Sequence, residues 1–160
     1  MIAYDITPID LHGHLFEVIL TMDAPEPEQE LWLPSWIPGS YLIRDFSKHI
    51  IGLYAEANGE AVAIKQVSKN RWRLNTAEKT VTVRYQVYAW DLSVRSAYLD
   101  QLQGFFNNTS LCLAVAGRED EACQLTLHAP VDALEWKVAT GMPRLTGQPH
   151  IWTPHITQVV

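Results

Sequence analysis

Two pairs of histidines have the side chain that binds a metal ion or moves a proton. His12 and His14 flank Gly13, and residues i and i+2 of a strand share one face, so both imidazoles could contact one ion. Zinc sites in proteins use three or four ligands, and no third candidate lies nearby in the sequence. His150 and His155 have a spacing that fits neither a helix face nor a strand face. The sequence also lacks His-Glu-x-x-His, so we predict no metal, cofactor or catalytic residue in this chain.

Ser40, Cys112 and Cys123 are the candidate nucleophiles. Ser40 lies in Pro-Gly-Ser-Tyr, which differs from Gly-x-Ser-x-Gly, and the sequence assigns it no histidine or acid. We therefore predict that Ser40 caps the N-terminus of a short helix. The two cysteines have no CxxC spacing, so we expect both to be buried thiols.

Five charged residues lie near tryptophans and tyrosines in two separate connections. Aspartate and arginine placed among large aromatic rings tend to pair, because the rings exclude water. We predict a structural charge network that ties the two connections together; the alternative is that each group is solvated. The residues are Arg44, Asp45, Asp91, Arg95 and Asp100.

The segment around Ser40 combines prolines, a glycine and bulky rings. Prolines and glycine fix a bent path and prevent a long strand or helix. Rigid aromatic side chains in such a loop lose little entropy when they bind another surface, although they can also be core residues. We predict a domain-docking or cleft-wall loop made of Trp36, Ile37, Pro38, Gly39, Ser40 and Tyr41.

Composition limits the class of protein. A chain of 160 residues with 48% apolar and 19% charged residues fits one folded domain. The net charge of -6 disfavours nucleic acid as a partner, because binding phosphates needs a basic surface. No apolar run approaches the length of a membrane helix, and the first residues do not resemble a signal peptide, so a cytoplasmic protein is expected.

Alternating patterns predict an all-β fold, a bent and saddle-like β-sandwich with at most one short helical segment, near Leu42 to Lys48. Ile2 to Ile6 and His14 to Leu20 should form one hairpin. Asn58-Gly59 should form the type I′ turn of another. Further strands are expected at Ser110 to Val115 and Leu134 to Val138. Lys79 to Trp90 should be a central strand with one buried face, made of Val81, Val83, Tyr85, Val87 and Ala89.

Four segments together resemble the N-terminal domain of the M61 glycyl aminopeptidases. They are LPSWIPGSYLIRDFSKHI (33–50), KNRWRL (69–74), YQVYAWDLSVRSAYLD (85–100) and GFFNNTSLCL (104–113). They occur in the family's order over nearly the whole chain. The resemblance implies a β domain that precedes a helical zinc domain carrying His-Glu-x-x-His, often with a PDZ-like domain after it. It weakens after Gly141, so we expect a sandwich domain over 1–146 and a tail or start of a connector over 147–160.

The resemblance implies a non-catalytic domain that packs on the zinc aminopeptidase domain and shapes a cleft for peptide N-termini. Its partners would be that catalytic domain and a peptide substrate, and the isolated chain would self-associate through its exposed docking loop. Zinc would belong to the catalytic domain. The alternative is a free-standing β-sandwich module that binds peptide or carbohydrate through exposed aromatic rings. A third hypothesis, an enzyme using a His12 and His14 metal, predicts stoichiometric zinc in the purified chain, and we expect none.

Overall fold

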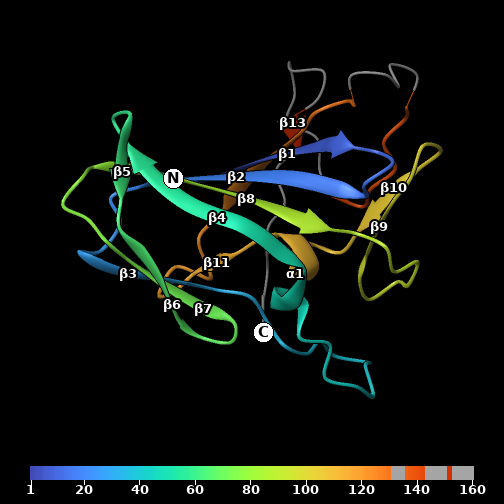
Figure 1. The fold of residues 1–160 in the computed structure, drawn as a ribbon, viewed down its shortest axis with the longest axis horizontal. Coiled ribbons are helices and arrows are strands. Elements are labelled where there is room, and N and C mark those ends of the chain that lie inside the picture. The colour runs from blue at the N-terminus through green and yellow to red at the C-terminus, as the bar shows by residue number, and fades with distance from the viewer. Residues whose placement is uncertain (131–135, 143–150, 153–160) are drawn as a thin grey trace.

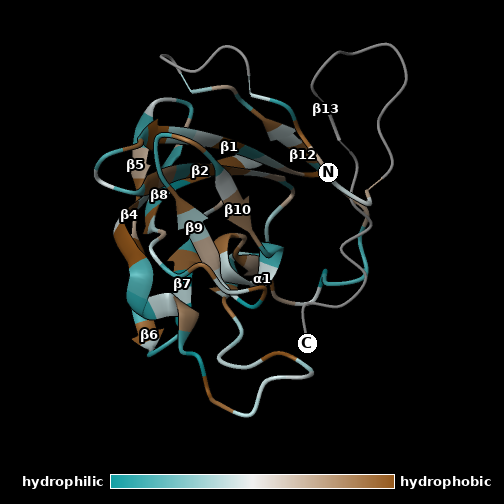
Figure 2. Cartoon of the chain, turned by 90° about the vertical axis from the view of Figure 1, so that its right-hand side faces the viewer, coloured by the Kyte–Doolittle hydropathy of each residue, from teal (hydrophilic) through white to brown (hydrophobic). Residues whose placement is uncertain are grey.

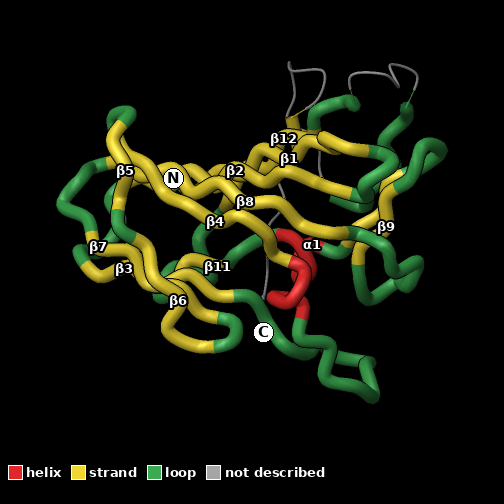
Figure 3. The backbone as a smooth tube through the Cα atoms, viewed as in Figure 1, coloured by secondary structure: helices red, strands yellow, loops and turns green. Residues whose placement is uncertain are grey.

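The chain forms two main β-sheets that pack face to face (Figure 1), and the all-β class is confirmed. This computed structural model describes residues 1–130, 136–142 and 151–152. The seven-stranded sheet has the order β13-β12-β1-β2-β8-β4-β5, and the four-stranded sheet has the order β11-β3-β7-β6. A two-stranded ribbon, β10-β9, lies beside them, and helical turns are short (Figure 3).

The strands of the large sheet are β1 (Ile2–Asp10), β2 (Leu15–Asp23), β4 (Ile50–Ala57), β5 (Glu60–Val62), β8 (Thr80–Tyr88), β12 (Cys123–Leu127) and β13 (Ile151–Trp152). Those of the small sheet are β3 (Glu28–Trp32), β6 (Ile64–Ser68), β7 (Arg71–Asn75) and β11 (Ala114–Val115). The ribbon consists of β9 (Ala97–Leu99) and β10 (Gly104–Phe106). The helical turns are η1 (Phe46–His49) and α1 (Asn108–Leu111).

The predicted hairpins are confirmed. Strands β1 and β2 pair antiparallel, and β4 and β5 pair across the turn Asn58-Gly59. Both turn residues have positive φ, 53° for Asn58 and 80° for Gly59, as a type I′ turn requires. One pairing crosses the sequence: β12 joins the edge of β1 in parallel, so the sheet is mixed.

Strand β8 is an interior strand between β2 and β4, as predicted. Its alternate side chains face the small sheet and form one core with residues of both sheets, including Phe16, Leu31 and Leu74. Figure 2 shows hydrophobic and hydrophilic residues mixed along the strands, as expected when one face is buried. All five predicted inward residues of this strand and its end are at most 1% exposed: Val81, Val83, Tyr85, Val87 and Ala89.

The segment predicted as a strand from Ser110 to Val115 begins as a helical turn, and only its end is a strand. Asn107 caps α1, because its Oδ1 accepts a hydrogen bond from the backbone N–H of Thr109 at 3.2 Å. The buried Tyr85 hydroxyl then donates to Leu111 O at 2.7 Å and accepts from Leu113 N at 3.0 Å. Tyr4 donates its hydroxyl hydrogen to Leu113 O at 2.7 Å. Side chains of the large sheet therefore satisfy the backbone of this irregular segment.

The helical segment near Leu42 to Lys48 is shorter than predicted, and Ser40 does not cap it. The structure has a 3₁₀ turn over Phe46–His49, preceded by Asp45 in the left-handed region with φ 49°. The backbone N–H groups of Arg44 and Asp45 both donate to Ser35 O, at 2.7 and 3.1 Å. Loop closure thus uses the donors that a longer helix would need.

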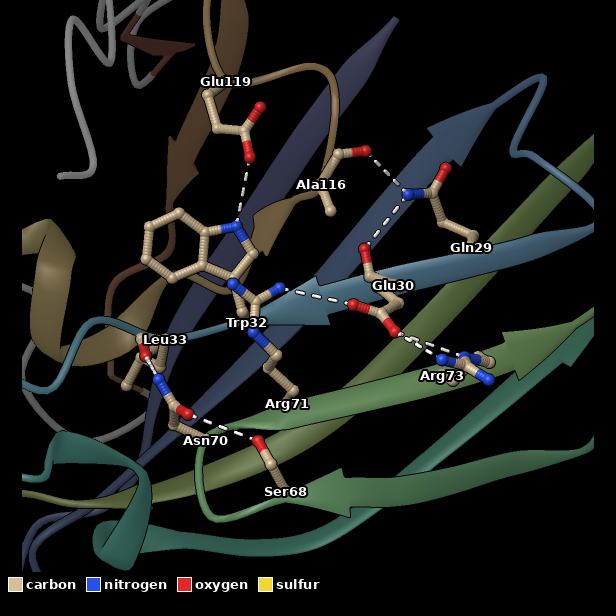
Figure 4. A network of polar contacts seen from close by, with 10 residues as sticks. All are labelled: Gln29, Glu30, Trp32, Leu33, Ser68, Asn70, Arg71, Arg73, Ala116 and Glu119. Carbon is tan, nitrogen blue, oxygen red and sulfur yellow. Dashed lines mark hydrogen bonds and ion pairs between the residues drawn. The ribbon is translucent and has the colours of Figure 1, made fainter.

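Polar contacts on the outer face of the small sheet join β3 to β7 (Figure 4). Glu30 accepts hydrogen bonds from Arg73 at 2.8 Å and from Arg71 at 3.3 Å. The bond from Arg73 is the main cause that lowers the pKa of Glu30. Arg71 also lies over the Trp32 ring, 5.6 Å from its centroid. These contacts hold β3 against β7, and the loop that begins at Ser35 follows the end of β3.

Two predictions concern the end of the chain. The predicted strand Leu134 to Val138 lies partly outside the described residues, and 136–138 are not in a strand. The predicted boundary at 146/147 also lies outside them. Residues Ile151–Trp152 form β13, which pairs antiparallel with β12. Among the described residues, no helix has the length and apolar character needed to cross a membrane.

Candidate docking surface

The chain between Ser35 and Asp45 closes on itself into a compact loop, which we call the docking loop. Its two ends meet where Ser35 O accepts hydrogen bonds from the backbone N–H groups of Arg44 and Asp45. Such loops with adjacent ends are frequently functional. The docking loop projects at the bottom of Figure 1, below η1, and Figure 2 shows hydrophobic residues along it.

Two consecutive residues of the β6–β7 turn hold the ends of the docking loop. Asn70 bonds Leu33, just before the loop, through its side-chain Nδ2 to Leu33 O at 2.6 Å and through its backbone O to Leu33 N at 3.0 Å. Lys69 Nζ donates to Asp45 Oδ2 at 2.9 Å at the other end. This contact with Lys69 is the main cause that lowers the pKa of Asp45. The small sheet therefore sets the direction of the loop.

Ser40 braces the inside of the docking loop. Its side chain is buried, with 7% exposed. The hydroxyl donates to Leu42 O at 2.8 Å and accepts from Leu42 N at 3.3 Å, while Trp36 Nε1 donates to Ser40 O at 2.7 Å. Gly39 has φ 83°, a conformation that glycine adopts without strain. Ser40 has no histidine or carboxylate among its recorded partners, so the geometry gives it a structural role.

The tip of the docking loop exposes three consecutive apolar side chains. Tyr41 is 101% exposed, Leu42 64% and Ile43 74%. Trp36 is 42% exposed, whereas Ile37 is 8% exposed and belongs to the core. A run of exposed apolar residues on a rigid loop costs solubility and is expected only where it binds something. The predicted set of residues ended at Tyr41, whereas the exposed apolar run continues to Ile43. The unbroken sequence Tyr-Leu-Ile was the signal for this longer run.

The connection 91–96 contacts the docking loop through the long side chain of Arg95. Arg95 Nε donates to Gly39 O at 3.2 Å, across 56 positions of sequence. The same connection exposes Leu92, at 67%, and Val94, at 72%. Arg95 therefore joins the two connections through a backbone carbonyl, and not through a charged member of the predicted network.

The predicted charge network does not form as ion pairs among its five members. In the described part of the chain, Asp45 pairs with Lys69, and Asp100 accepts hydrogen bonds from the backbone of residues 102 and 103 and from Tyr98. Those backbone N–H groups are the main cause that lowers the pKa of Asp100. Asp91 is exposed, and none of the five is buried. For Asp100 the short turn supplies the partners, because its backbone donors are already in place close to the carboxylate.

His12 and His14 have structural partners, whereas His150 and His155 lie outside the described residues. His12 Nδ1 contacts Gln101 Nε2 at 2.8 Å, and His14 Nδ1 bonds Leu99 O at 2.6 Å while its ring lies 3.8 Å from that of Trp90. No group of three potential metal ligands occurs in the part of the chain that the structure describes. Both cysteines are buried, as predicted, and burial raises the pKa of Cys112 strongly.

The fold and the docking loop together define a β-sandwich domain with an exposed apolar loop that is closed by backbone hydrogen bonds. The chain belongs to the Peptidase M61 N-terminal domain family, whose model matches residues 3–159. It is similar to a solved crystal structure of an aminopeptidase N family protein from Idiomarina loihiensis, with 70% identity and a TM-score of 0.93. The match covers 97% of this chain and 27% of that one, so the chain spans about a quarter of the longer relative. A search of curated proteins found no match.

Proposed function

We propose that this chain is the non-catalytic N-terminal domain of an M61-type zinc aminopeptidase. Its docking loop packs on the catalytic domain and forms one wall of a cleft that accepts peptide N-termini. The observation that carries the proposal is the exposure of Tyr41, Leu42 and Ile43 on a loop closed by backbone bonds. The longer relative supports it, because most of that chain lies beyond the region that this domain matches.

The physical argument is that the docking loop loses little freedom on binding. Burial of each large apolar side chain contributes about 1.5–3 kcal/mol. The cost of ordering a loop is mostly avoided here, since the bonds of Ser35, Ser40 and Asn70 already fix its backbone. Tyr41 is also of a residue type that is enriched among those that dominate binding energy in protein interfaces. Zinc and the bond-breaking residues are assigned to the catalytic domain.

The alternative of a peptide- or carbohydrate-binding module is favoured by one observation. Tyr88 and Trp90, at the end of β8, are 40% and 51% exposed. However, Trp90 stacks on Tyr98, with 5.0 Å between centroids, and also on His14. Ring faces that stack on one another are less available to a sugar, so Trp90 is better suited to holding β9 against the large sheet.

The test uses a chimaera in which this chain replaces the matched region of the Idiomarina relative. Hydrogen exchange of the docking-loop amides is compared between the isolated chain and the chimaera, together with hydrolysis of a glycyl substrate. We expect slower exchange in the chimaera, activity that chelation abolishes, and no activity in the isolated chain.

The variant that tests the loop is Tyr41→Ser with Leu42→Ser and Ile43→Ser. Because all three side chains are exposed, the isolated domain should keep its stability within about 0.5 kcal/mol. In the chimaera the protection of the loop should be lost and KM should rise. Tyr54→Ser, on the outer face of β4, is the control. Equal protection in the triple variant and the unmodified chimaera would contradict the docking role, and sedimentation would show whether the substitutions also reduce self-association.

A further inference from the structure

Arg44 of the docking loop and Arg95 of the connection 91–96 each use only part of the hydrogen-bonding capacity of their guanidinium groups. Arg44 Nε donates to Ser40 Oγ at 3.1 Å, and Arg95 Nε donates to Gly39 O at 3.2 Å. Both recorded bonds use Nε, so the Nη groups keep their donors for another acceptor. Since Gly39 and Ser40 are consecutive, the same turn anchors both cations. Neither has a carboxylate partner among the described residues.

The other described arginines are all paired with glutamate. Their partners are Glu30 for Arg71 and Arg73, Glu17 for Arg84, and Glu121 for Arg118. The chain has a net charge of -6, so acidic groups are in excess, yet Asp45, next to Arg44 in the sequence, bonds Lys69 instead. The two arginines without an acid are therefore the two that meet at the docking loop.

We propose that Arg44 and Arg95 form a carboxylate-binding site whose ligand is an aspartate or glutamate side chain of the domain that follows in the longer relative. This inference rests on the proposed docking function and adds the chemistry of the contact. A guanidinium presents parallel N–H donors that match both oxygens of a carboxylate. Both cations are partly shielded, and the apolar residues 41–43 adjoin them, so docking would exclude water and strengthen the pairing.

The site is also preorganised. Each side chain is held at Nε by an atom of the Gly39-Ser40 turn, and Ser40 is itself fixed by four further hydrogen bonds within the loop. Less side-chain entropy is lost when an anchored arginine binds than when a free one does. The apolar tip would supply the area of the contact, and the two arginines would fix its register.

The experiment introduces Arg44→Gln and Arg95→Gln into the chimaera, with Arg84→Gln, on the outer face of the large sheet, as the control. Hydrogen exchange of the docking loop measures how often the domains separate. Each loop variant should lower the protection of the loop by about tenfold or more, because removal of one partner of a buried charge pair typically costs that much or more. The control should lower it little. Arg44→Lys and Arg95→Lys retain charge without the fork and should recover only part of the loss.

Thermal unfolding of each isolated variant shows whether the domain is folded. If a glutamine variant is unfolded, the lysine variant at the same position tests the carboxylate site instead. Unchanged protection in both loop variants, with the unmodified chimaera protected, would overturn the carboxylate site and leave the docking function standing. An unmodified chimaera without protection would overturn both. An equal loss in Arg84→Gln would also refute the site. If protection stays while KM rises only for peptides with a free C-terminal carboxylate and not for their amides, the assignment to a domain side chain is wrong.

Discussion

Replacement of Tyr85 by phenylalanine should destabilise the domain more than the same change at Tyr4. Both hydroxyls are buried and form hydrogen bonds with the backbone of residues 111–113, which directly precede β11. Tyr85 makes two bonds, one donated to Leu111 O and one accepted from Leu113 N, whereas one donated bond is recorded for Tyr4, to Leu113 O. The Tyr85→Phe variant would thus leave a buried donor and a buried acceptor without this partner.

The magnitude follows from the number of groups that lose a partner. A buried group left unsatisfied costs about 1–3 kcal/mol, so Tyr85→Phe, which removes the partner of two groups, should cost about 2–6 kcal/mol and Tyr4→Phe about 1–3 kcal/mol. Both rings remain in place, so neither variant opens a large cavity. Because the two residues share the 111–113 segment, the double variant should not be additive.

Urea denaturation of the wild type, both single variants and the double variant measures these free energies of unfolding. The midpoint should shift with little change in the slope against urea, since the fold is retained. Equal effects of the two single variants, or a loss below about 0.5 kcal/mol for Tyr85→Phe, would refute the view that these hydroxyls hold the segment.

Two further predictions concern pH and packing. Burial is the main cause that raises the pKa of Tyr4, Tyr85 and Cys112 in the folded domain. As pH rises, the unfolded chain therefore loses these protons before the folded domain does. The stability that these groups contribute is present below about pH 9 and should fall as pH rises beyond the ordinary pKa values of cysteine and tyrosine. Urea titrations between pH 8 and 11 should show the fall, which should be shallower in Tyr85→Phe; a flat profile would contradict the burial of these groups. Gly104→Ala should cost about 1–3 kcal/mol, because a Cβ there would lie 3.2–3.3 Å from neighbouring side chains. Gly141→Ala, with no atom within 4 Å, should be near neutral, and equal melting temperatures for the two would count against the packing argument.

The candidate site was only partly predictable. Prolines and glycine marked the bent loop, and the exposure of Trp36 and Tyr41 agrees with a docking surface. Ile37 has the same chemistry yet is buried, and Leu42 and Ile43 are exposed although they lie outside the predicted set. Apolar side chains in an irregular loop have no period, so sequence gives no rule for which of them faces water.

Strand periodicity and turn chemistry were determined by the sequence alone. The alternation in β8 and the Asn58-Gly59 turn are local properties, because the pleat and the allowed φ values depend on neighbouring residues. The partners of the charges were decided by the tertiary structure. Lys69 reaches Asp45, and Arg95 reaches Gly39, only after distant segments have been brought together by the packing of the two sheets. Such pairings depend on which groups meet in space, and spacing along the chain does not carry that information.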